Sequence, residues 1–232
     1  MKTIGLLGGM SWESSAVYYR IINELVRDRL GGLHSADCLM YSLDFGPVAQ
    51  AQKEGRWEEA AAALVSAGQT LQRGGADFLV LCTNTMHKVA DQLAAGVKIP
   101  LLHLIDTTAQ AIGRAGMSRV GLLGTAFTME QSFYRDRLSS HGIDTVTPNT
   151  TDRELVHRVI YEELCQGVVR EESRQAYQRV IERLAVAGAQ GVILGCTEIE
   201  LLIAAKDSVV PVFPTTALHA EAAVDLALSS HV

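Results

Sequence analysis

One stretch of the sequence occurs twice, first as Gly75-Ala76-Asp77-Phe78-Leu79-Val80-Leu81-Cys82-Thr83 and again, one residue longer, as Gly188-Ala189-Gln190-Gly191-Val192-Ile193-Leu194-Gly195-Cys196-Thr197. Each copy carries an apolar run typical of a buried strand into a cysteine followed by small hydrogen-bonding residues. The repeat predicts that the chain consists of two similar halves, each with a strand that ends at a thiol.

Two further landmarks repeat in the same order and at nearly the same distance. Gly5-Leu6-Leu7-Gly8 returns as Gly121-Leu122-Leu123-Gly124, and Ile99-Pro100-Leu101 returns as Val210-Pro211-Val212. Three landmarks in one order indicate a duplicated fold whose halves join near Gly113–Ser118.

Apolar runs of strand type alternate with Ala-rich segments of helical pattern. We expect strands at 3–7, 37–43, 78–81, 101–103, 119–123, 144–147, 191–194 and 210–213, and helices at 14–30, 57–73, 107–115, 130–141, 151–166 and 171–187. This alternation is typical of βαβ units and predicts an α/β fold with parallel sheets covered on both faces. Ligands of such sheets bind beyond the carboxyl ends of the strands, where the repeated motifs lie.

Composition excludes several classes of protein. The 232 residues are 48% hydrophobic with mean hydropathy +0.15, enough for a substantial core in one large domain or two small ones. Net charge is −6, and Lys and Arg are scattered, so we expect no nucleic-acid-binding surface. The first residues do not resemble a signal peptide, and no apolar run approaches a membrane span. A cytoplasmic protein that acts on a small molecule is expected.

The four cysteines fall into two groups. Cys38 and Cys165 lie inside predicted elements and are interpreted as small core residues, whereas Cys82 and Cys196 each end a strand and match in the repeat. No C-x-x-C pair is present, so we expect free thiols and neither zinc nor a disulfide framework. A thiol pKa of about 8.5 suits acid/base chemistry, and helix N–H groups nearby are expected to favour the thiolate. One thiol on each face of a substrate would invert a carbon centre without a cofactor.

The polar residues beside these cysteines have both structural and functional interpretations. Asn84, Thr85 and Thr197 are expected either to cap helices or to anchor a substrate carboxylate, and Glu198 either to bind an α-ammonium group or to complement a helix dipole. His87, His103 and His219 lack metal-ligand spacing. Packing is the favoured role of His87, with tuning of Cys82 as the alternative.

Glycine turns follow the first strand of each half. Gly8-Gly9-Met10-Ser11 is neither a dinucleotide-binding nor a Walker A sequence. It is expected to bring backbone N–H groups and Ser11 to the site, with capping by Ser11 or Ser14 as the structural alternative. Gly124-Thr125-Ala126-Phe127-Thr128 would do the same from the second half, which makes Thr128 a further candidate.

These motifs together resemble the aspartate/glutamate racemase superfamily. The resemblance rests on Leu7-Gly8-Gly9-Met10-Ser11-Trp12, Asp44-Phe45, Cys82-Thr83-Asn84-Thr85-Met86-His87-Lys88, Gly124-Thr125 with Thr128-Met129, and Gly195-Cys196-Thr197-Glu198. It is greatest to the aspartate racemase branch and to broad-specificity amino-acid racemases of enteric bacteria. The cell-wall glutamate racemases differ: they carry Asp-Ser at Met10-Ser11 and Cys-Thr-His at Cys196-Thr197-Glu198.

The resemblance implies a fold and an assembly. It implies two flavodoxin-like domains related by a pseudo-twofold axis, here 1–114 with 215–232 and 115–214, with the active site in the cleft between them. The final helix, about 215–229, would pack back onto the first domain. A homodimer without a cofactor is implied as well.

The resemblance also implies roles for individual residues. Cys82 and Cys196 match the two catalytic cysteines of the family. The positions that match its substrate pocket are Met10, Gln52, Thr83, Asn84, Thr85, Thr125, Thr197 and Glu198. A cofactor-independent amino-acid racemase is therefore predicted, in which one thiolate removes the α-proton and the other thiol returns one.

Alternatives remain open from the sequence. The alternatives are a cysteine-dependent dicarboxylate isomerase or decarboxylase, a hydantoin racemase, and a non-catalytic amino-acid-binding module; the presence of both cysteines argues against a one-cysteine decarboxylase. Aspartate or glutamate would want a cation in the pocket, for which Lys53, Arg56 and Lys88 are candidates by position, although surface solvation is the favoured role of each. A neutral amino acid is the substrate expected if no cation reaches the site.

Overall fold

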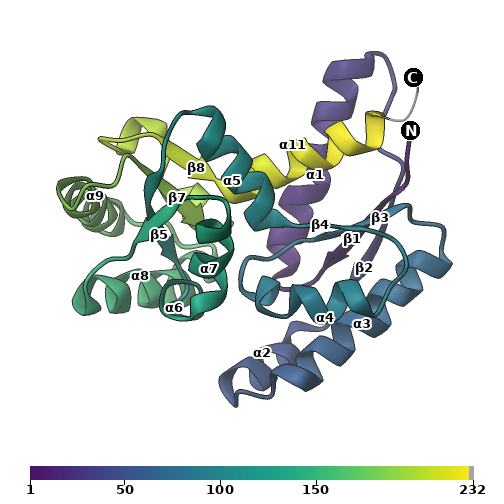
Figure 1. Ribbon diagram of the computed structural model, residues 1–232, viewed down its shortest axis with the longest axis horizontal. Coiled ribbons are helices and arrows are strands. Elements are labelled where there is room, and N and C mark those ends of the chain that lie inside the picture. The colour runs from purple at the N-terminus through teal and green to yellow at the C-terminus, as the bar shows by residue number, and fades with distance from the viewer. Residues whose placement is uncertain (230–232) are drawn as a thin grey trace. The chain divides into compact units, whose positions relative to one another are not determined.

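The computed structural model describes residues 1–229, and the chain forms two compact units (Figure 1). The first comprises Met1–Leu104 and the segment that begins at His219, and the second comprises Ile105–Leu218. The first boundary lies between residues 104 and 105, before the predicted division at 114/115, and the second lies between 218 and 219, after the predicted division at 214/215. Residues 230–232 of the predicted first domain lie outside the described part.

The first unit contains one parallel sheet with strand order β2-β1-β3-β4. Its elements are β1 (Ile4–Gly8), α1 (Trp12–Leu30), β2 (Cys38–Ser42), α2 (Phe45–Lys53), α3 (Trp57–Arg73), β3 (Phe78–Leu81), a 3₁₀ helix (Thr85–Val89), α4 (Ala90–Ala95), β4 (Leu101–Leu102) and, from His219 onward, α11 (Thr215–Leu228). The strands on either side of β1 come from different βα units, so the order of the sheet reverses there. Such a reversal is where ligands of open α/β sheets bind.

The second unit repeats this architecture with strand order β6-β5-β7-β8. Its elements are α5 (Leu104–Arg114), β5 (Arg119–Gly124), α6 (Ala126–Glu130), α7 (Ser132–Ser140), β6 (Asp144–Val146), α8 (Thr150–Glu162), a 3₁₀ helix (Leu164–Gln166), α9 (Glu171–Val186), β7 (Gly191–Gly195), α10 (Ile199–Leu202), a 3₁₀ helix (Ala205–Asp207) and β8 (Val212–Pro214). The predicted α/β class with two parallel sheets is confirmed. The duplicated sequence is a duplicated fold.

Alternating side chains of the first sheet build a core on each face. Ile4 and Leu6 pack with α1 and with the alanines of α11, whereas Leu7 packs in a separate cluster with α2, α3 and α4. The period of two in β1 therefore commits one set of side chains to each layer of helices. The final helix packs on the first unit, as the resemblance implied.

The second unit has the same kind of core. Leu123 of β5 and Leu194 of β7 pack against buried side chains of α8 and α9. Tyr177 of α9 is fully buried, and its hydroxyl donates to the carbonyl of Val156 at 2.9 Å. That bond satisfies the one polar group of a large core side chain.

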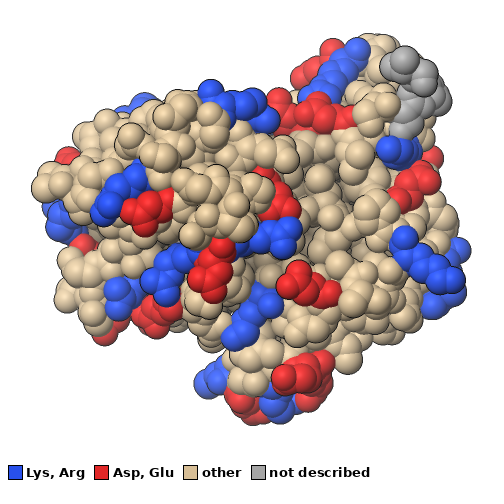
Figure 2. Space-filling model, viewed as in Figure 1, with Lys and Arg blue, Asp and Glu red and all other residues tan. Residues whose placement is uncertain are grey.

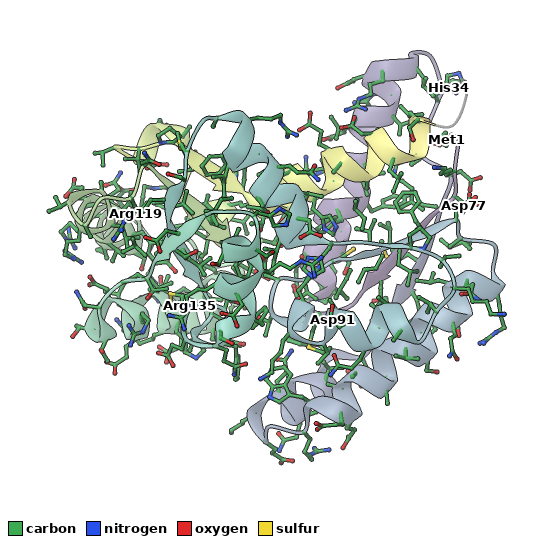
Figure 3. The ribbon with its side chains drawn as sticks, viewed as in Figure 1. Met1, His34, Asp77, Asp91, Arg119 and Arg135 are labelled. Carbon is green, nitrogen blue, oxygen red and sulfur yellow. The ribbon has the colours of Figure 1, made fainter. Side chains whose placement is uncertain are left out.

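The amino ends of the strands are fixed by polar groups that serve the fold. Asp77, labelled in Figure 3, accepts the N–H of Thr3 at 2.6 Å before β1 and β3. Arg119 forms an ion pair with Asp144 at 2.8 Å, which links the starts of β5 and β6. The repeated motifs lie at the opposite, carboxyl ends.

Some local predictions differ from the structure. The predicted helix at 130–141 corresponds to α7, which begins at Ser132 because Gln131 has an extended backbone with ψ of 153°; the separate helix α6 before it was not predicted. The sequence patterns missed α2, α4 and α10, and α4 and α10 are only six and four residues long. Cys165 was expected in the core, but it lies exposed in the 3₁₀ helix after α8. Cys38 is half-buried in β2, in contact with the core.

The surface agrees with the charge pattern of the sequence. On the face shown in Figure 2, Lys and Arg are interspersed with Asp and Glu. Within residues 1–229, no helix combines the length and the apolar character needed to cross a membrane.

Replacing Gly9 with alanine should destabilise the protein strongly. Gly9 has φ of +91°, and an added Cβ would collide with the backbone N and O of Leu43. We expect Gly9→Ala to lower the free energy of unfolding by about 3 kcal/mol or more, measured by urea denaturation. Gly55 has φ of +71° with open space around it, so Gly55→Ala should cost only about 1 kcal/mol. Equal losses would contradict the clash.

Acidification should remove stability that depends on His219. The pKa of His219 is lowered from 6.5 to about 4, mainly by burial; the nearby His103 acts in the same direction, and a hydrogen bond from His219 to the carbonyl of Leu102 opposes both. The unfolded chain therefore takes up this proton below pH 6.5, whereas the folded protein does so only near pH 4. The stabilising contribution is full above pH 6.5 and declines toward pH 4, by up to about 3 kcal/mol.

Urea unfolding at several pH values between 7 and 4 checks this sign. The stability of wild type should fall more steeply with acidification than that of His219→Gln, while His34→Gln, at an exposed histidine, should follow wild type. Parallel curves for wild type and His219→Gln would contradict the prediction.

Candidate active site

Cys82 directly follows β3, at the carboxyl edge of the first sheet. Its N–H donates to the carbonyl of Leu7 at 2.9 Å, which extends the pairing of β3 with β1 by one residue. The thiol is fully buried and donates to the carbonyl of Val80 at 3.6 Å. Burial raises the pKa of the Cys82 thiol far above its ordinary value, so the thiol is protonated at neutral pH.

The polar residues after Cys82 are buried with it. Thr83, Asn84 and Thr85 are each at most 9% exposed. Asn84 precedes the 3₁₀ helix, but its side chain makes no capping hydrogen bond there. Capping, one of the two roles expected of Asn84, is therefore absent, and its buried amide lies two residues after Cys82.

The glycine turn after β1 lies against the same strand end. The hydroxyl of Ser14 donates to the carbonyl of Cys82 at 3.3 Å, while Ser11 caps α1 by accepting the N–H of Ser14 at 3.2 Å. Met10 is buried in the apolar cluster under α2 and α3, and its peptide bond to Ser11 is cis. The structural role of Ser11 as a helix cap is confirmed.

Gln52 joins this group from a distant part of the sequence. It lies near the end of α2, is only 5% exposed, and directs its amide nitrogen to the sulfur of Met86 at 2.9 Å. The contact brings α2, which sequence patterns missed, to the turn that carries Cys82.

Cys196 follows β7 in the equivalent position of the second sheet. Its thiol donates to Oε2 of Glu198 at 2.8 Å, and Glu198 is itself 8% exposed. Burial and then the negative charge of Glu198 raise the pKa of the Cys196 thiol well above its ordinary value of 9.0. Glu198 was expected to bind an ammonium group or to complement a helix dipole, and the structure shows it paired with the thiol.

Helix N–H groups were expected to favour the thiolates, but burial outweighs them: the N–H of Glu198, at the start of α10, lowers the pKa of Cys196, and that pKa is still raised overall. Burial raises the pKa of both Cys82 and Cys196. Only short helical segments follow them, the 3₁₀ helix and α10, so little dipole opposes the cost of burying a charge.

A hydrogen-bonded chain continues from Thr197, the residue after the second cysteine. The hydroxyls of Thr197 and Thr216 lie 2.9 Å apart, and the N–H of Thr216 donates to Oε1 of Glu200 at 2.9 Å. Burial raises the pKa of Glu200 to about 7. Sequence reasoning missed Glu200, for which the alternation Glu198-Ile199-Glu200 was the one available signal.

The second glycine turn provides two more of the predicted residues. Thr125 caps α6 through the N–H of Thr128, at 3.4 Å, and the two hydroxyls lie 3.3 Å apart. Thr128 is fully buried. Its methyl group fills the space beside Gly124, where an added Cβ would lie 3.0 Å away. The side chain of Thr128 therefore packs the turn against β5.

Each of the three candidate cations either contacts another side chain or is exposed to solvent. Arg56 pairs with Glu54 at 2.7 Å and also with Glu59, and Lys53 is exposed. The ammonium of Lys88 lies 4.1 Å from the centre of the Trp57 ring, and burial lowers its pKa. Among the residues described, no group of three or more His, Cys, Asp or Glu side chains is arranged to hold a metal ion.

Each unit thus presents one protonated thiol at the carboxyl end of its third strand, among buried hydroxyls and, in the first unit, two buried amides. A thiol in such surroundings can donate a proton, and it becomes a base once a partner removes that proton. Glu198 is a partner of this kind for Cys196, at hydrogen-bond distance.

Comparisons with known proteins agree with this arrangement. The family model described as Asp/Glu/Hydantoin racemase matches residues 7–223. A solved structure of an Asp/Glu racemase candidate from Yersinia pestis is 56% identical, with TM-score 0.93 over 98% of this chain and 100% of that one. An aspartate racemase homologue from Pyrococcus horikoshii is 33% identical, with TM-score 0.87 over 98% and 99%. The broad specificity amino-acid racemase RacX of Bacillus subtilis is 20% identical over 97% of this chain and 98% of RacX.

Removing the charge of Glu198 should make Cys196 easier to ionise. In Glu198→Gln the carboxylate no longer opposes the thiolate, so the pKa of Cys196 should fall, although burial still keeps it raised. The measurement is the pH dependence of iodoacetamide alkylation at each cysteine, resolved by peptide mass spectrometry. Cys38, at the start of β2 in the first unit, serves as the internal control and should not change. An unchanged Cys196 profile would mean that the contact with Glu198 has no effect on ionisation.

Proposed function

The chain belongs to the Asp/Glu/Hydantoin racemase family, and we propose that it interconverts L- and D-amino acids without a cofactor, with Cys82 and Cys196 as the two acid/base groups. The family match spans nearly the whole chain, and the two relatives that are 56% and 33% identical are described as an Asp/Glu racemase candidate and an aspartate racemase homologue.

The observation that carries the proposal is the equivalence of the two cysteines. Cys82 follows β3 and Cys196 follows β7, and these strands hold the same place in two sheets of identical order. Inversion at a carbon requires a proton to leave one face and another to arrive at the opposite face. A duplicated fold that supplies one thiol per unit provides the two groups which that reaction needs.

The protonation states suggest how turnover begins in one direction. Glu198 takes the proton of the Cys196 thiol, the thiolate removes the α-proton of the amino acid, and the Cys82 thiol delivers its proton to the other face. Glu198 then loses its proton to solvent as the product leaves, and Cys82 regains one. The reverse direction starts from a Cys82 thiolate.

The weakly acidic α-carbon also requires stabilisation of the developing negative charge. We assign this role to the predicted pocket residues, which present buried hydroxyls and amides near the cysteines: Thr83, Asn84, Thr85, Gln52, Thr125 and Thr197. Fixed dipoles of this kind lower such barriers because they need no reorganisation during the reaction.

Aspartate and glutamate are the first substrates to test, because of the family and the two closer relatives named above. Lys88 is the candidate cation for their side-chain carboxylate, since it follows the Cys82 turn and its charge is partly desolvated. RacX is described as having broad specificity, so neutral amino acids belong in the same panel. A homodimer in the cytoplasm remains our prediction for the assembly and its location.

The test is α-proton exchange in deuterated buffer without added cofactor, followed by NMR over a panel of L- and D-amino acids. Wild type should exchange and invert its substrate. Cys82→Ala and Cys196→Ala should each lose inversion by at least ~10²-fold, because each removes one acid/base group. Cys38→Ala, at the half-buried cysteine that begins β2, should retain wild-type inversion.

Other outcomes separate the alternatives. Binding by calorimetry without any exchange would indicate a non-catalytic binding module. No exchange or binding with any amino acid would turn the search to dicarboxylate isomerisation, decarboxylation or hydantoin racemisation. Inversion that survives the loss of either cysteine would overturn the two-thiol mechanism.

A further inference from the structure

The chain passes between the two units twice, and both passages lie in the first turns of a helix. It leaves the first unit after Leu104, where α5 begins, and returns at His219, in the second turn of α11. The first N–H groups of any helix have no acceptor within the helix and need one from elsewhere. In this protein a titratable side chain from the cysteine-bearing turn supplies that acceptor in each unit.

In the first unit the acceptor is His87. Its Nε2 accepts the N–H of Leu104 at 3.1 Å, and its Nδ1 lies 2.7 Å from the carbonyl of Thr83. Since Nε2 is the acceptor, the ring proton is on Nδ1 and is donated to Thr83. His87 is 4% exposed, and the ring of His103 packs against it with centroids 4.7 Å apart. One neutral imidazole therefore joins the residue after Cys82 to the start of α5.

In the second unit the acceptor is Glu200. Its Oε1 accepts the N–H of Thr216 in the first turn of α11, and the hydroxyl of Thr216 lies 2.9 Å from that of Thr197. Thr215 adds a bond from its hydroxyl to the carbonyl of Leu194 at 2.9 Å. The residue after Cys196 is thus joined to the start of α11, as Thr83 is joined to the start of α5.

The two arrangements are equivalent in the duplicated fold. His87 lies five residues after Cys82, and Glu200 lies four residues after Cys196. Each accepts an N–H at the start of the helix through which the chain leaves that unit, α5 for His87 and α11 for Glu200. The residue type differs between the halves, whereas the hydrogen bond to a helix-start N–H is the same.

We propose that His87 and Glu200 are positioning residues that couple each cysteine to the helix through which the chain passes to the other unit. This inference rests on the proposed function for its catalytic consequence. If a racemase must hold each thiol at a fixed place relative to a substrate, then loss of His87 affects Cys82, and loss of Glu200 affects Cys196. The effect of each residue is therefore local to one thiol.

The test uses pairs of variants of the full chain. His87→Phe and Glu200→Met remove the acceptor, whereas His87→Gln and Glu200→Gln keep an oxygen able to accept the helix N–H. His34→Phe and Glu172→Met alter exposed residues of the same types and serve as matched controls. The Gln variants keep the proposal testable if an apolar variant fails to fold.

The first readout is independent of catalysis. Alkylation of each thiol by iodoacetamide is followed by peptide mass spectrometry, with Cys38 of β2 as the reference. His87→Phe should speed alkylation of Cys82 about tenfold and leave that of Cys196 unchanged. Glu200→Met should speed alkylation of Cys196 by the same factor and leave that of Cys82 unchanged. The reason is that loss of a buried hydrogen bond favours local opening by about that factor. The Gln variants should lie closer to wild type than the apolar ones.

The second readout is α-proton exchange from each enantiomer of the substrate. Cys82→Ala and Cys196→Ala identify which enantiomer each thiol deprotonates. His87→Phe should lower kcat about tenfold for the enantiomer that depends on Cys82, with KM nearly unchanged, and Glu200→Met should lower it for the other enantiomer.

The outcomes are distinguishable. If both variants change the alkylation rates of Cys82 and Cys196 equally, the residues affect only general stability, and the positioning role is overturned. If neither variant changes either rate, the positioning role is overturned as well. A wild type that fails to exchange any amino acid would refute the proposed function, while the alkylation pattern would still decide whether the two residues hold the thiols.

Discussion

The parallel pairing of β1 with β3, and of β5 with β7, is the constraint on which the rest of the structure depends. In register, Leu7 pairs with Leu81 and Gly124 pairs with Gly195. Parallel strands end at the same edge of a sheet, so the glycine turn after one strand and the cysteine turn after its neighbour must be adjacent. Gly9 permits this in the first unit, because its positive φ and missing side chain let the turn pass close to the backbone of Leu43.

Burial at that edge then sets the chemistry of the thiols. Cys82 is fully buried and Cys196 is half-buried against the core of its unit, and desolvation makes the charged form of each thiol unfavourable. The two cysteines are nevertheless not alike. Cys196 has a carboxylate at 2.8 Å, whereas the bond given by the Cys82 thiol goes to a main-chain carbonyl. The duplicated fold therefore carries two thiols that donate to different acceptors, a carboxylate in one unit and a main-chain carbonyl in the other.

Side chains just beyond each cysteine link this chemistry to the path of the chain. His87 and Glu200 both lie within five residues of a thiol, and both accept an N–H from a helix that continues into the other unit. Each bond satisfies a backbone group that a helix start leaves open, which is a structural need. His87 also donates from Nδ1 to the carbonyl of Thr83, and the hydroxyl of Thr216 lies 2.9 Å from that of Thr197. These second contacts reach the residue that follows each cysteine.

The sequence by itself determined the class of fold and the two thiols, because both depend on local patterns. Apolar runs followed by turns gave all eight strands with ends correct to within two residues, and the repeat around Cys82 and Cys196 indicated the duplication. Only the tertiary structure decided what those thiols contact. The pairing of Cys196 with Glu198, the approach of Gln52 to Met86 and the bond from Leu104 to His87 depend on how side chains meet across elements. The periodicity of a sequence does not show which side chains come into contact across elements, nor the burial that keeps both thiols protonated.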